Sequence, residues 1–448
     1  MNSERPETDR SEGDVNISPL RARWQAAHIG AQARALLDED ARYFLHQALS
    51  TPCLNALESC NGSTLVDLEG REILDFHGNS AHQIGYGHPK VLRAIREQLD
   101  TLPFSPRRYT NRPAVELARR LSTLAPMKDA RVLFAPGGAS AVSMALKLAR
   151  LVTRRYKTIS WWGSFHGATL DAISVGGEAM FRDGLGPLLP GAMHVPPPGG
   201  ADGVSPEESL KQIELIFDSE DDIAAFIAEP IRCTTVVQPP VDYWRRVREL
   251  CDRYGALLIF DEIPIGLGRT GHMFACEYTG IEPDIVCLGK GLGGGVFPMA
   301  AIVARGELNI VASSSIGHFT HEKSPVGAAA SLATLDVIDQ DRLLERTLRM
   351  GEEVLAKLRA SQTRHPIIHD VRGCGMLFAV ELGDDSGRGR RAADTADAVL
   401  YACLRRGLSF KVSSGNVLTL SPPLNIADAE MARALAMLDE VLTEVIGA

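Results

Sequence analysis

The chain has 448 residues, 45% of them hydrophobic and 23% charged, which is an ordinary globular composition and enough for two or more domains. Its net charge of -9, with scattered lysines and arginines, argues against a nucleic-acid partner. The N-terminus lacks an apolar leader, no apolar run is long enough to span a membrane, and the eight cysteines form no CxxC pair, so we expect a cytoplasmic protein with reduced thiols.

The N-terminal part begins with a polar stretch, and we expect residues 1–22 to be a disordered tail. From Leu65, the sequence LVDLEGREILDF alternates apolar and polar residues around Glu69-Gly70, which predicts a β-hairpin. HPKVLRAIREQLDTL predicts a helix with Pro89 at its start. We expect residues 23–85 to form an N-terminal segment that packs with a small C-terminal domain.

Beyond residue 110, short apolar runs alternate with helical patterns. Strands that are apolar on both faces and separated by helices predict a mostly parallel sheet covered on both sides. We therefore expect a large α/β domain over residues 86–335 and a smaller α+β domain over residues 336–448, with a long helical stretch from about Val326 to Ser361. The apolar runs are RVLFA, KTISWW, IAAFIAEP, ALLIFDE, IVCLG and MAAIVA.

The first candidate binding segment follows the run RVLFA. In open α/β sheets, ligands bind beyond the carboxyl ends of the strands. Here the run leads into Pro136-Gly137-Gly138 and a predicted helix that begins near Ala139. Glycines allow close approach to the backbone, and the N–H groups of a first helical turn bind anions, so a phosphate ester would fit. A plain strand-to-helix turn explains the segment equally well.

Three other strand ends carry side chains suited to cofactor chemistry. Asp261 closes a buried strand, where a carboxylate either caps a turn or keeps a pyridine nitrogen protonated. Lys290 follows another strand, and a lysine at a buried strand end predicts a desolvated amine with a lowered pKa, able to form an imine. Phe165 and His166 follow a third strand, at its carboxyl end, where Phe165 either stacks on a flat aromatic ligand or packs in the core.

Three further patterns argue against other ligands. The GxGxxG of residues 266–271 lies beyond Asp261 and not directly between a strand and a helix, which disfavours dinucleotide binding. Lys290 lacks the Ser or Thr and the upstream glycine of a P-loop. His318 and His321 have no matching third ligand, so no metal site is predicted.

Together, these residues resemble the class III (ω-) aminotransferase family of fold-type I enzymes, which use pyridoxal 5'-phosphate (PLP). The similarity extends from about Leu65 to Leu424. It implies an α/β fold with a mostly parallel seven-stranded sheet in the large domain and a smaller α+β domain, PLP as the cofactor, and a homodimer with shared active sites. The matching motifs are FHG at 165–167, EP at 229–230, Asp261-Glu262, GLGRTG and the strand that ends in Lys290.

The resemblance also implies roles for individual residues. Lys290 matches the lysine that holds PLP as a Schiff base, and Asp261 matches the partner of the ring nitrogen. Phe165 matches the stacking aromatic residue, and Thr320 the threonine that reaches the phosphate from the neighbouring subunit. The remaining implied cofactor contacts are Gly138 and Ala139 in the phosphate cradle, and His166.

The departures from the family pattern bear on the reaction. Gly137, Ala139 and Ser140 stand where the family's phosphate loop usually carries hydroxyl residues and a Glu, and Pro264 stands where a Gln usually contacts the cofactor's phenolic oxygen. Thr419 replaces an Arg that usually binds a substrate α-carboxylate and otherwise pairs with the Glu of the EP motif. A transaminase accepts two amino acids in turn, so this replacement removes an expected anchor and favours a lyase, which handles one substrate.

Several segments resemble a subgroup of the family, the ammonia-lyases that act on (R)-1-hydroxy-2-aminoethylphosphonate, which are relatives of the phospho-lyases for ethanolamine phosphate. The implied reaction is α-deprotonation by Lys290, elimination of the β-hydroxyl, and release of ammonia and phosphonoacetaldehyde. The alternatives are a class III aminotransferase that passes an amino group from an ω-amine or amino acid to a keto acid, and a catalytically silent binding protein. The segments are DFHGNSAHQIGYGHP, RRYTN, APGGAS, THEKSP and FKVSSGNVLTLSPPL.

A phosphonate dianion needs cationic or hydrogen-bond-donating partners. His82, Arg107, Arg108 and Lys411 are the candidates by their positions in these segments. Each is equally well explained as a solvated surface charge.

Overall fold

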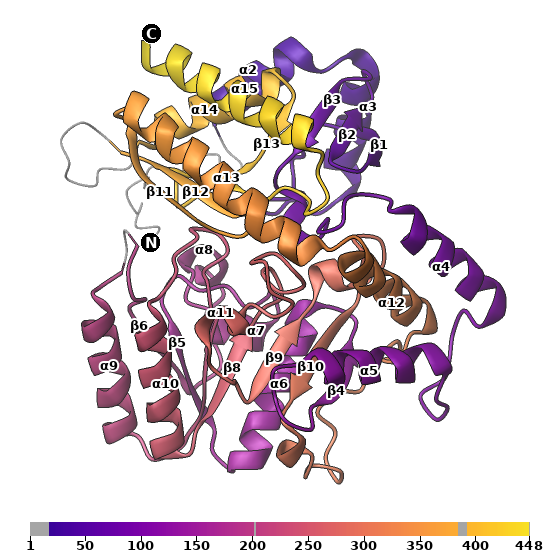
Figure 1. Ribbon diagram of the computed structural model, residues 1–448, viewed down its shortest axis with the longest axis vertical. Coiled ribbons are helices and arrows are strands. Elements are labelled where there is room, and N and C mark those ends of the chain that lie inside the picture. Colours follow the sequence, from indigo (N-terminus) through magenta and orange to yellow (C-terminus); the bar gives the residue numbers. More distant parts are fainter. Residues whose placement is uncertain (1–17, 201–202, 384–391, 448) are drawn as a thin grey trace. The chain divides into compact units, whose positions relative to one another are not determined.

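The computed structural model describes residues 18–200, 203–383 and 392–447 (Figure 1). The chain divides into two compact units. The large unit comprises Asn79–Cys233 and Val237–Thr347, and the small unit comprises the described residues up to Gly78, Thr234–Val236, and those from Leu348 onward. The units thus divide at 78/79 and 347/348, compared with the sequence-based boundaries at 85/86 and 335/336.

The expected tail falls mostly on residues 1–17, which lie outside the described residues. Residues 19–22 were also expected to be disordered, but they form the first turn of helix α2 (Pro19–His28). The hydroxyl of Ser18 accepts a hydrogen bond from the N–H of Leu20 at 3.1 Å, and proline at the first helical position has a backbone already suited to a helix.

The large unit contains a seven-stranded sheet with the order β4-β10-β9-β8-β7-β5-β6. β10 pairs antiparallel with β4 and β9, and the other neighbours pair parallel, which confirms the mostly parallel sheet predicted from the sequence. β6 was not among the predicted runs because its four residues include His194. The strands are β4 (Arg131–Ala135), β5 (Lys157–Trp161), β6 (Ala192–Val195), β7 (Ile223–Ala228), β8 (Leu257–Asp261), β9 (Ile285–Leu288) and β10 (Ala300–Ala304).

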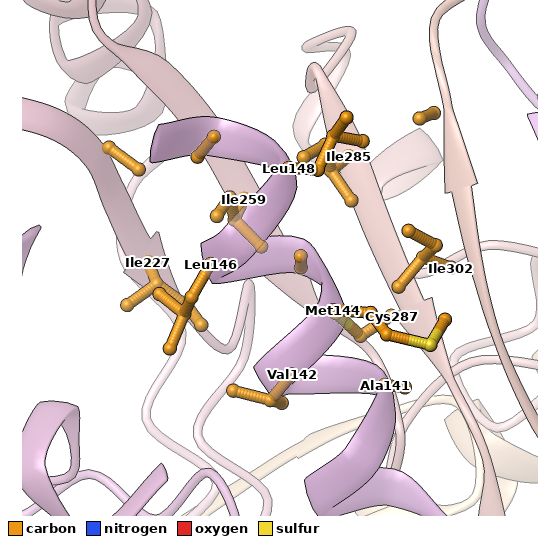
Figure 2. Close-up of a cluster of buried hydrophobic side chains, with 14 of the residues drawn as sticks. Ala141, Val142, Met144, Leu146, Leu148, Ile227, Ile259, Ile285, Cys287 and Ile302 are labelled. Carbon is orange, nitrogen blue, oxygen red and sulfur yellow. The ribbon is translucent and has the colours of Figure 1, made fainter. Parts of the chain in front are cut away.

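Helices cover both faces of this sheet. Ile227 and Ile259 lie with Val142 and Leu146 of α6 in one buried cluster (Figure 2). Alternate residues of a strand point to opposite faces, and Phe260, next to Ile259, makes an edge contact with Trp244 of α10 at a centroid distance of 4.8 Å. The helices are α4 (Pro89–Thr101), α5 (Arg112–Leu124), α6 (Gly138–Thr153), α7 (Leu170–Val175), α8 (Ala179–Arg182), α9 (Pro206–Ser219), α10 (Val241–Tyr254), α11 (Cys276–Thr279) and α12 (Pro325–Gln340).

Burial of α6 fixes the position of its N-terminus. Alanines and aliphatic residues fill its sheet-facing side, and complete burial of one aliphatic side chain contributes about 1.5–3 kcal/mol. The helix begins at Gly138, and only two residues separate it from the end of β4 at Ala135. Its first turn is therefore held near the edge of the sheet where the strand ends.

The predicted helical stretch after Val326 consists of two helices, α12 and α13 (Leu343–Arg364). They are separated at Asp341-Arg342, where Arg342 has φ 50° and interrupts the helical backbone. α13 crosses the division between the two units at 347/348. The predicted helix that starts at Pro89 is confirmed as α4.

The small unit contains two four-stranded sheets, ordered β1-β2-β3-β13 and β11-β12-β15-β14. The predicted hairpin is confirmed, because β2 and β3 pair antiparallel around Gly70, which has φ +77°. Three short strands lie between the last two helices of the C-terminal part. The elements are α3 (Ala31–Tyr43), β1 (Leu57–Asn61), β2 (Thr64–Asp67), β3 (Glu72–Asp75), β11 (Ile368–Cys374), β12 (Leu377–Leu382), α14 (Ala393–Arg405), β13 (Leu408–Ser409), β14 (Lys411–Ser413), β15 (Val417–Leu420) and α15 (Asp428–Gly447).

In the described part of the chain, no helix is both long and apolar enough to cross a membrane.

Candidate cofactor site

Asp261 and Lys290 lie at the same edge of the large sheet. Asp261 is the last residue of β8 and pairs with Cys287 of the parallel strand β9. Lys290 follows Cys287 by three residues. Parallel strands end at a common edge, so the carboxylate and the lysine occupy neighbouring strand ends. The sequence predicted a strand end for each residue, and the strand order makes the two ends neighbours.

The carboxylate of Asp261 is buried and held from two sides. Nδ1 of His166 lies 2.8 Å from Oδ2, and the N–H of Ile263 donates to Oδ1 at 3.1 Å. An ionised carboxylate only accepts hydrogen bonds, so Nδ1 carries the ring proton. Nε2 of His166 is buried and has no hydrogen-bond partner among the described residues. The imidazole therefore fixes the orientation of the Asp261 carboxylate.

Three glycines allow the strand ends to touch. A Cβ atom on Gly138 would lie 3.0 Å from Cδ1 of Ile263, and one on Gly289 would lie 3.2 Å from Cγ2 of the same residue. Gly167 has φ +128°, and a Cβ there would lie 2.6 Å from the Cβ of Ala139. The first turn of α6, the segment after Asp261 and the segment before Lys290 are therefore in direct contact.

The N-terminus of α6 offers free backbone donors. No side chain caps the helix at Gly137, and Gly138, Ala139 and Ser140 are partly exposed. The first N–H groups of a helix have no intrahelical acceptor, and the helix dipole adds positive potential there. This end of α6 can therefore hold an anionic group such as a phosphate.

Lys290 differs from the sequence prediction in one respect. The sequence suggested a desolvated amine, but Lys290 is exposed, whereas the four residues of β9 before it are buried. The chain leaves β9 at Gly289, and Lys290 starts the short 3-10 turn η2 (Lys290–Gly293) with φ 45°. A non-glycine residue in this region is strained, which is common at functional sites. The turn thus leaves the Lys290 side chain accessible at this edge of the sheet.

Phe165 is half-buried, and its ring centroid lies 4.5 Å from that of Phe181 in α8. The ring packs against another side chain and still has accessible surface, and its stacking on a ligand stays a prediction. Its neighbour His166 contacts Asp261, so Phe165 lies beside the same strand ends. A flat ligand can stack on such a ring.

Glu262 follows Asp261 and is also buried. Its carboxylate accepts hydrogen bonds from the N–H groups of Ala275 and Cys276, at 2.5 and 2.7 Å. Burial raises the pKa of the Glu262 carboxyl to about 7, although the two N–H donors favour the ionised form. Glu262 therefore closes the loop that contains the GLGRTG motif, which explains that motif without a dinucleotide.

Gln83 is a site residue that the sequence analysis did not select. Its Nε2 donates to the carbonyl of Gly266 at 2.7 Å, and its Cγ would lie 2.4 Å from a Cβ on Gly291. Gln83 thus packs against the turn that carries Lys290. The only sequence signal for Gln83 was its place in the segment DFHGNSAHQIGYGHP. Its contact with Gly266 could not be foreseen, because the two residues are 183 positions apart. The predicted residue His82 is fully buried next to Gln83.

Arg107, Arg108 and Thr320 lie on two exposed loops of the large unit. The loops contact each other, because Nδ2 of Asn111 donates to the carbonyl of Lys323 at 3.0 Å. Among the described residues, no hydrogen bond or ion pair joins these three side chains to Asp261 or Lys290. The contact of Thr320 with the cofactor phosphate of a neighbouring subunit stays a prediction.

Lys411 belongs to the small unit, where it begins β14 and is half-buried. Its assignment as a substrate contact also stays a prediction.

The residues at this edge fit PLP. The uncapped α6 terminus suits the phosphate, Asp261 suits the ring nitrogen, Phe165 suits the ring face, and the exposed amine of Lys290 suits the aldehyde carbon. The segments that follow four strands thus carry groups that are complementary to such a ligand.

Comparison with known proteins agrees with this geometry. The family model described as "Aminotransferase class-III" matches residues 46–442. The chain is 46% identical to a "(R)-1-hydroxy-2-aminoethylphosphonate ammonia-lyase" of Vibrio splendidus (strain 12B01), covering 97% of this chain and 95% of that protein. It is 35% identical to "5-aminovalerate aminotransferase DavT" of Pseudomonas putida, covering 87% and 93%.

Solved structures give the same result. A Bacillus anthracis aminotransferase superposes with a TM-score of 0.84 at 28% identity, covering 92% of this chain and 98% of that one. A PLP-bound amine transaminase from an uncultivated Pseudomonas species superposes with a TM-score of 0.83 at 29% identity, covering 90% and 99%. The chain therefore belongs to the class III aminotransferase family of fold-type I, PLP-dependent enzymes.

Proposed function

We propose that this chain is a PLP-dependent ammonia-lyase that converts (R)-1-hydroxy-2-aminoethylphosphonate to phosphonoacetaldehyde and ammonia. The observation that carries the proposal is the 46% identity to a protein of that name over nearly the whole of both chains. The other relatives reported above share about a third of their residues or fewer and have aminotransferase names.

The surroundings of Glu229 and Thr419 support a reaction with one substrate. Within the large unit, Glu229 already has a cationic partner, because Arg232 lies 2.9 Å from its Oε1. Within the small unit, Thr419 is buried and donates a hydrogen bond to the carbonyl of Thr234. Position 419 therefore lacks the arginine that, in the resembled family, alternates between this Glu and a substrate α-carboxylate.

The chain's own groups can perform the proton transfers. Bound PLP draws electrons from the carbon that bears the substrate nitrogen. We assign removal of the proton on that carbon to Nζ of Lys290, and we assign to Asp261 the task of keeping a proton on the ring nitrogen. His166 holds the Asp261 carboxylate in place through the 2.8 Å hydrogen bond.

The products follow from the atoms of the substrate. The electron pair of the broken C–H bond forms a double bond to the neighbouring carbon, whose hydroxyl takes a proton and leaves as water. The unsaturated amine that is released takes up one water and gives ammonia and phosphonoacetaldehyde. The net reaction consumes no keto acid.

The experiment is to incubate purified, PLP-loaded enzyme with the hydroxyphosphonate alone. We expect ammonia and phosphonoacetaldehyde in equal amounts, and an added keto acid should not raise the rate. Product formation that depends strictly on a keto acid would overturn the lyase proposal.

Product formation that requires a keto acid would support the alternative, a class III aminotransferase. The 35% identity to a 5-aminovalerate aminotransferase favours this alternative. A panel of ω-amines with a keto acid would then identify the amino donor.

A further inference from the structure

Arg232 lies beside the candidate cofactor site, although no sequence motif marked it. β7 and β8 are parallel neighbours, with Ala228 paired to Phe260. Glu229 directly follows β7, and Asp261 is the last residue of β8. Nη1 of Arg232 lies 2.9 Å from Oε1 of Glu229. The guanidinium is therefore anchored at the end of β7, next to the strand that ends in Asp261.

A second set of contacts leads from Arg232 to Phe165. Its Nη2 lies 3.6 Å from Oε2 of Glu178. The carbonyl of Glu178 accepts a hydrogen bond from the N–H of Phe181 at 3.2 Å, and Phe181 packs on Phe165. Contacts thus lead from Arg232 through Glu178 and Phe181 to Phe165, and the next residue in the chain, His166, binds Asp261.

The two carboxylates hold Arg232 with different strength. Glu229 is 5% exposed in its side chain, and its second oxygen accepts the N–H of Cys233 at 2.9 Å, so this pair is buried and fixed. Glu178 is 32% exposed, and its oxygen is beyond hydrogen-bond distance of Nη2. A partly exposed ion pair of this kind contributes little and can be exchanged.

The guanidinium can therefore accept another anion. Arginine has five N–H donors in a planar fork, and this fork matches two oxygens of a phosphonate or carboxylate. The Arg232 side chain is 14% exposed. A dianion that approached from the side of Glu178 would replace the weak contact and leave the Glu229 pair intact.

We propose that Arg232 is the specificity-determining residue that binds the phosphonate of the substrate, with Glu229 as its fixed anchor and Glu178 as the carboxylate that the substrate displaces. The inference rests on the proposed function for the identity of the substrate. Arg232 joins the earlier candidates for substrate binding, which are His82, Arg107, Arg108 and Lys411. A guanidinium dedicated to the phosphonate also suits an enzyme that binds one substrate, whereas a transaminase accepts two amino acids in turn.

The test uses two variants with opposite expected effects, measured on the PLP-loaded enzyme. Arg232→Gln should raise KM for the hydroxyphosphonate roughly ten- to hundredfold, with kcat changed much less, because it removes charged hydrogen bonds to the substrate. Glu178→Gln should lower KM, because it removes the competing carboxylate and leaves the Arg232–Glu229 pair in place. Arg245→Gln is the matched control, since Arg245 is an exposed arginine in an ordinary surface ion pair.

A binding measurement separates this inference from catalysis. Methylphosphonate, titrated calorimetrically into each PLP-loaded variant, should bind more weakly to Arg232→Gln and more tightly to Glu178→Gln than to the wild type. An unchanged affinity in Glu178→Gln, or an unchanged KM in a folded Arg232→Gln, would overturn the role of Arg232. If Arg232→Gln does not fold, Glu178→Gln decides the question by itself.

The outcomes also distinguish the two proposals. If the wild type releases no ammonia from the hydroxyphosphonate, the proposed function fails. The methylphosphonate titrations still report whether Arg232 binds a phosphonate in that case. If the wild type is active and the titrations show no effect of either variant, only the inference about Arg232 fails.

Discussion

Nδ1 of His166 lies 2.8 Å from Oδ2 of Asp261, and both side chains are almost completely buried. The two residues are 95 positions apart in the sequence; His166 comes from the loop after β5, and Asp261 is the last residue of β8. A buried, hydrogen-bonded carboxylate is held in one orientation, which is what a fixed partner of a ring nitrogen requires.

Asp261→Asn should lower kcat on the order of a hundredfold or more, because the amide cannot stabilise a protonated ring nitrogen. His166→Gln should have a smaller effect, since its amide can still donate to Asp261. Ammonia release at saturating substrate, together with the PLP content of each protein, checks both expectations. Asp252→Asn, on the exposed face of α10, is the control and should retain wild-type activity. Full activity in Asp261→Asn would refute the assigned role.

Lys290→Ala should abolish ammonia release and should weaken retention of PLP during gel filtration, because the covalent link to the cofactor is lost. In the wild type, borohydride treatment followed by peptide mass analysis should place the reduced cofactor on Lys290. Lys211→Ala, which changes an exposed lysine of α9, should behave as the wild type. Finding the cofactor on another lysine would contradict the assignment.

Gly167→Ala should destabilise the protein and loosen the phosphate end of the site, because a Cβ there would lie 2.6 Å from that of Ala139 in the first turn of α6. Gly163→Ala is a matched control, since Gly163 also has positive φ and a Cβ there meets nothing within 4 Å. We expect Gly167→Ala to lose about 1–3 kcal/mol more than the control. Urea unfolding and PLP dissociation measure the two effects, and equal losses in both variants would contradict the prediction.

His194→Gln should make the stability of the protein less sensitive to acid. Burial, together with the nearby Arg182, lowers the pKa of His194 from 6.5 to about 4. The unfolded chain therefore takes up a proton below about pH 6.5 that the folded chain refuses until about pH 4, so the free energy of unfolding falls across this window as the pH falls. His194→Gln has no imidazole to protonate at this position, so its free energy of unfolding should not show this contribution to the fall.

The measurement is urea unfolding of both proteins at pH 7.5 and pH 5. The stability difference between the two pH values should be larger for the wild type than for His194→Gln. His46→Gln, which changes an exposed histidine of the small unit, is the control. Parallel pH profiles for the wild type and His194→Gln would show that His194 does not titrate in this way.

The sequence by itself determined the elements and the residue types at the strand ends. Continuous apolar runs predicted six of the seven strands of the large sheet, because buried parallel strands need apolar residues on both faces. It also placed Asp261, Lys290 and the Gly138 turn at the ends of such runs, where ligands bind. These signals are local and need no knowledge of the order of the strands.

Only the tertiary structure decided which of these residues meet. The order of strands in the sheet brings His166 to Asp261, and chain packing brings Gln83 to Gly266. It also showed that Lys290 is exposed and that Arg232 is held between two carboxylates. Contacts of this kind depend on the positions of residues far apart in the chain, and no local pattern of hydrophobicity or spacing encodes them.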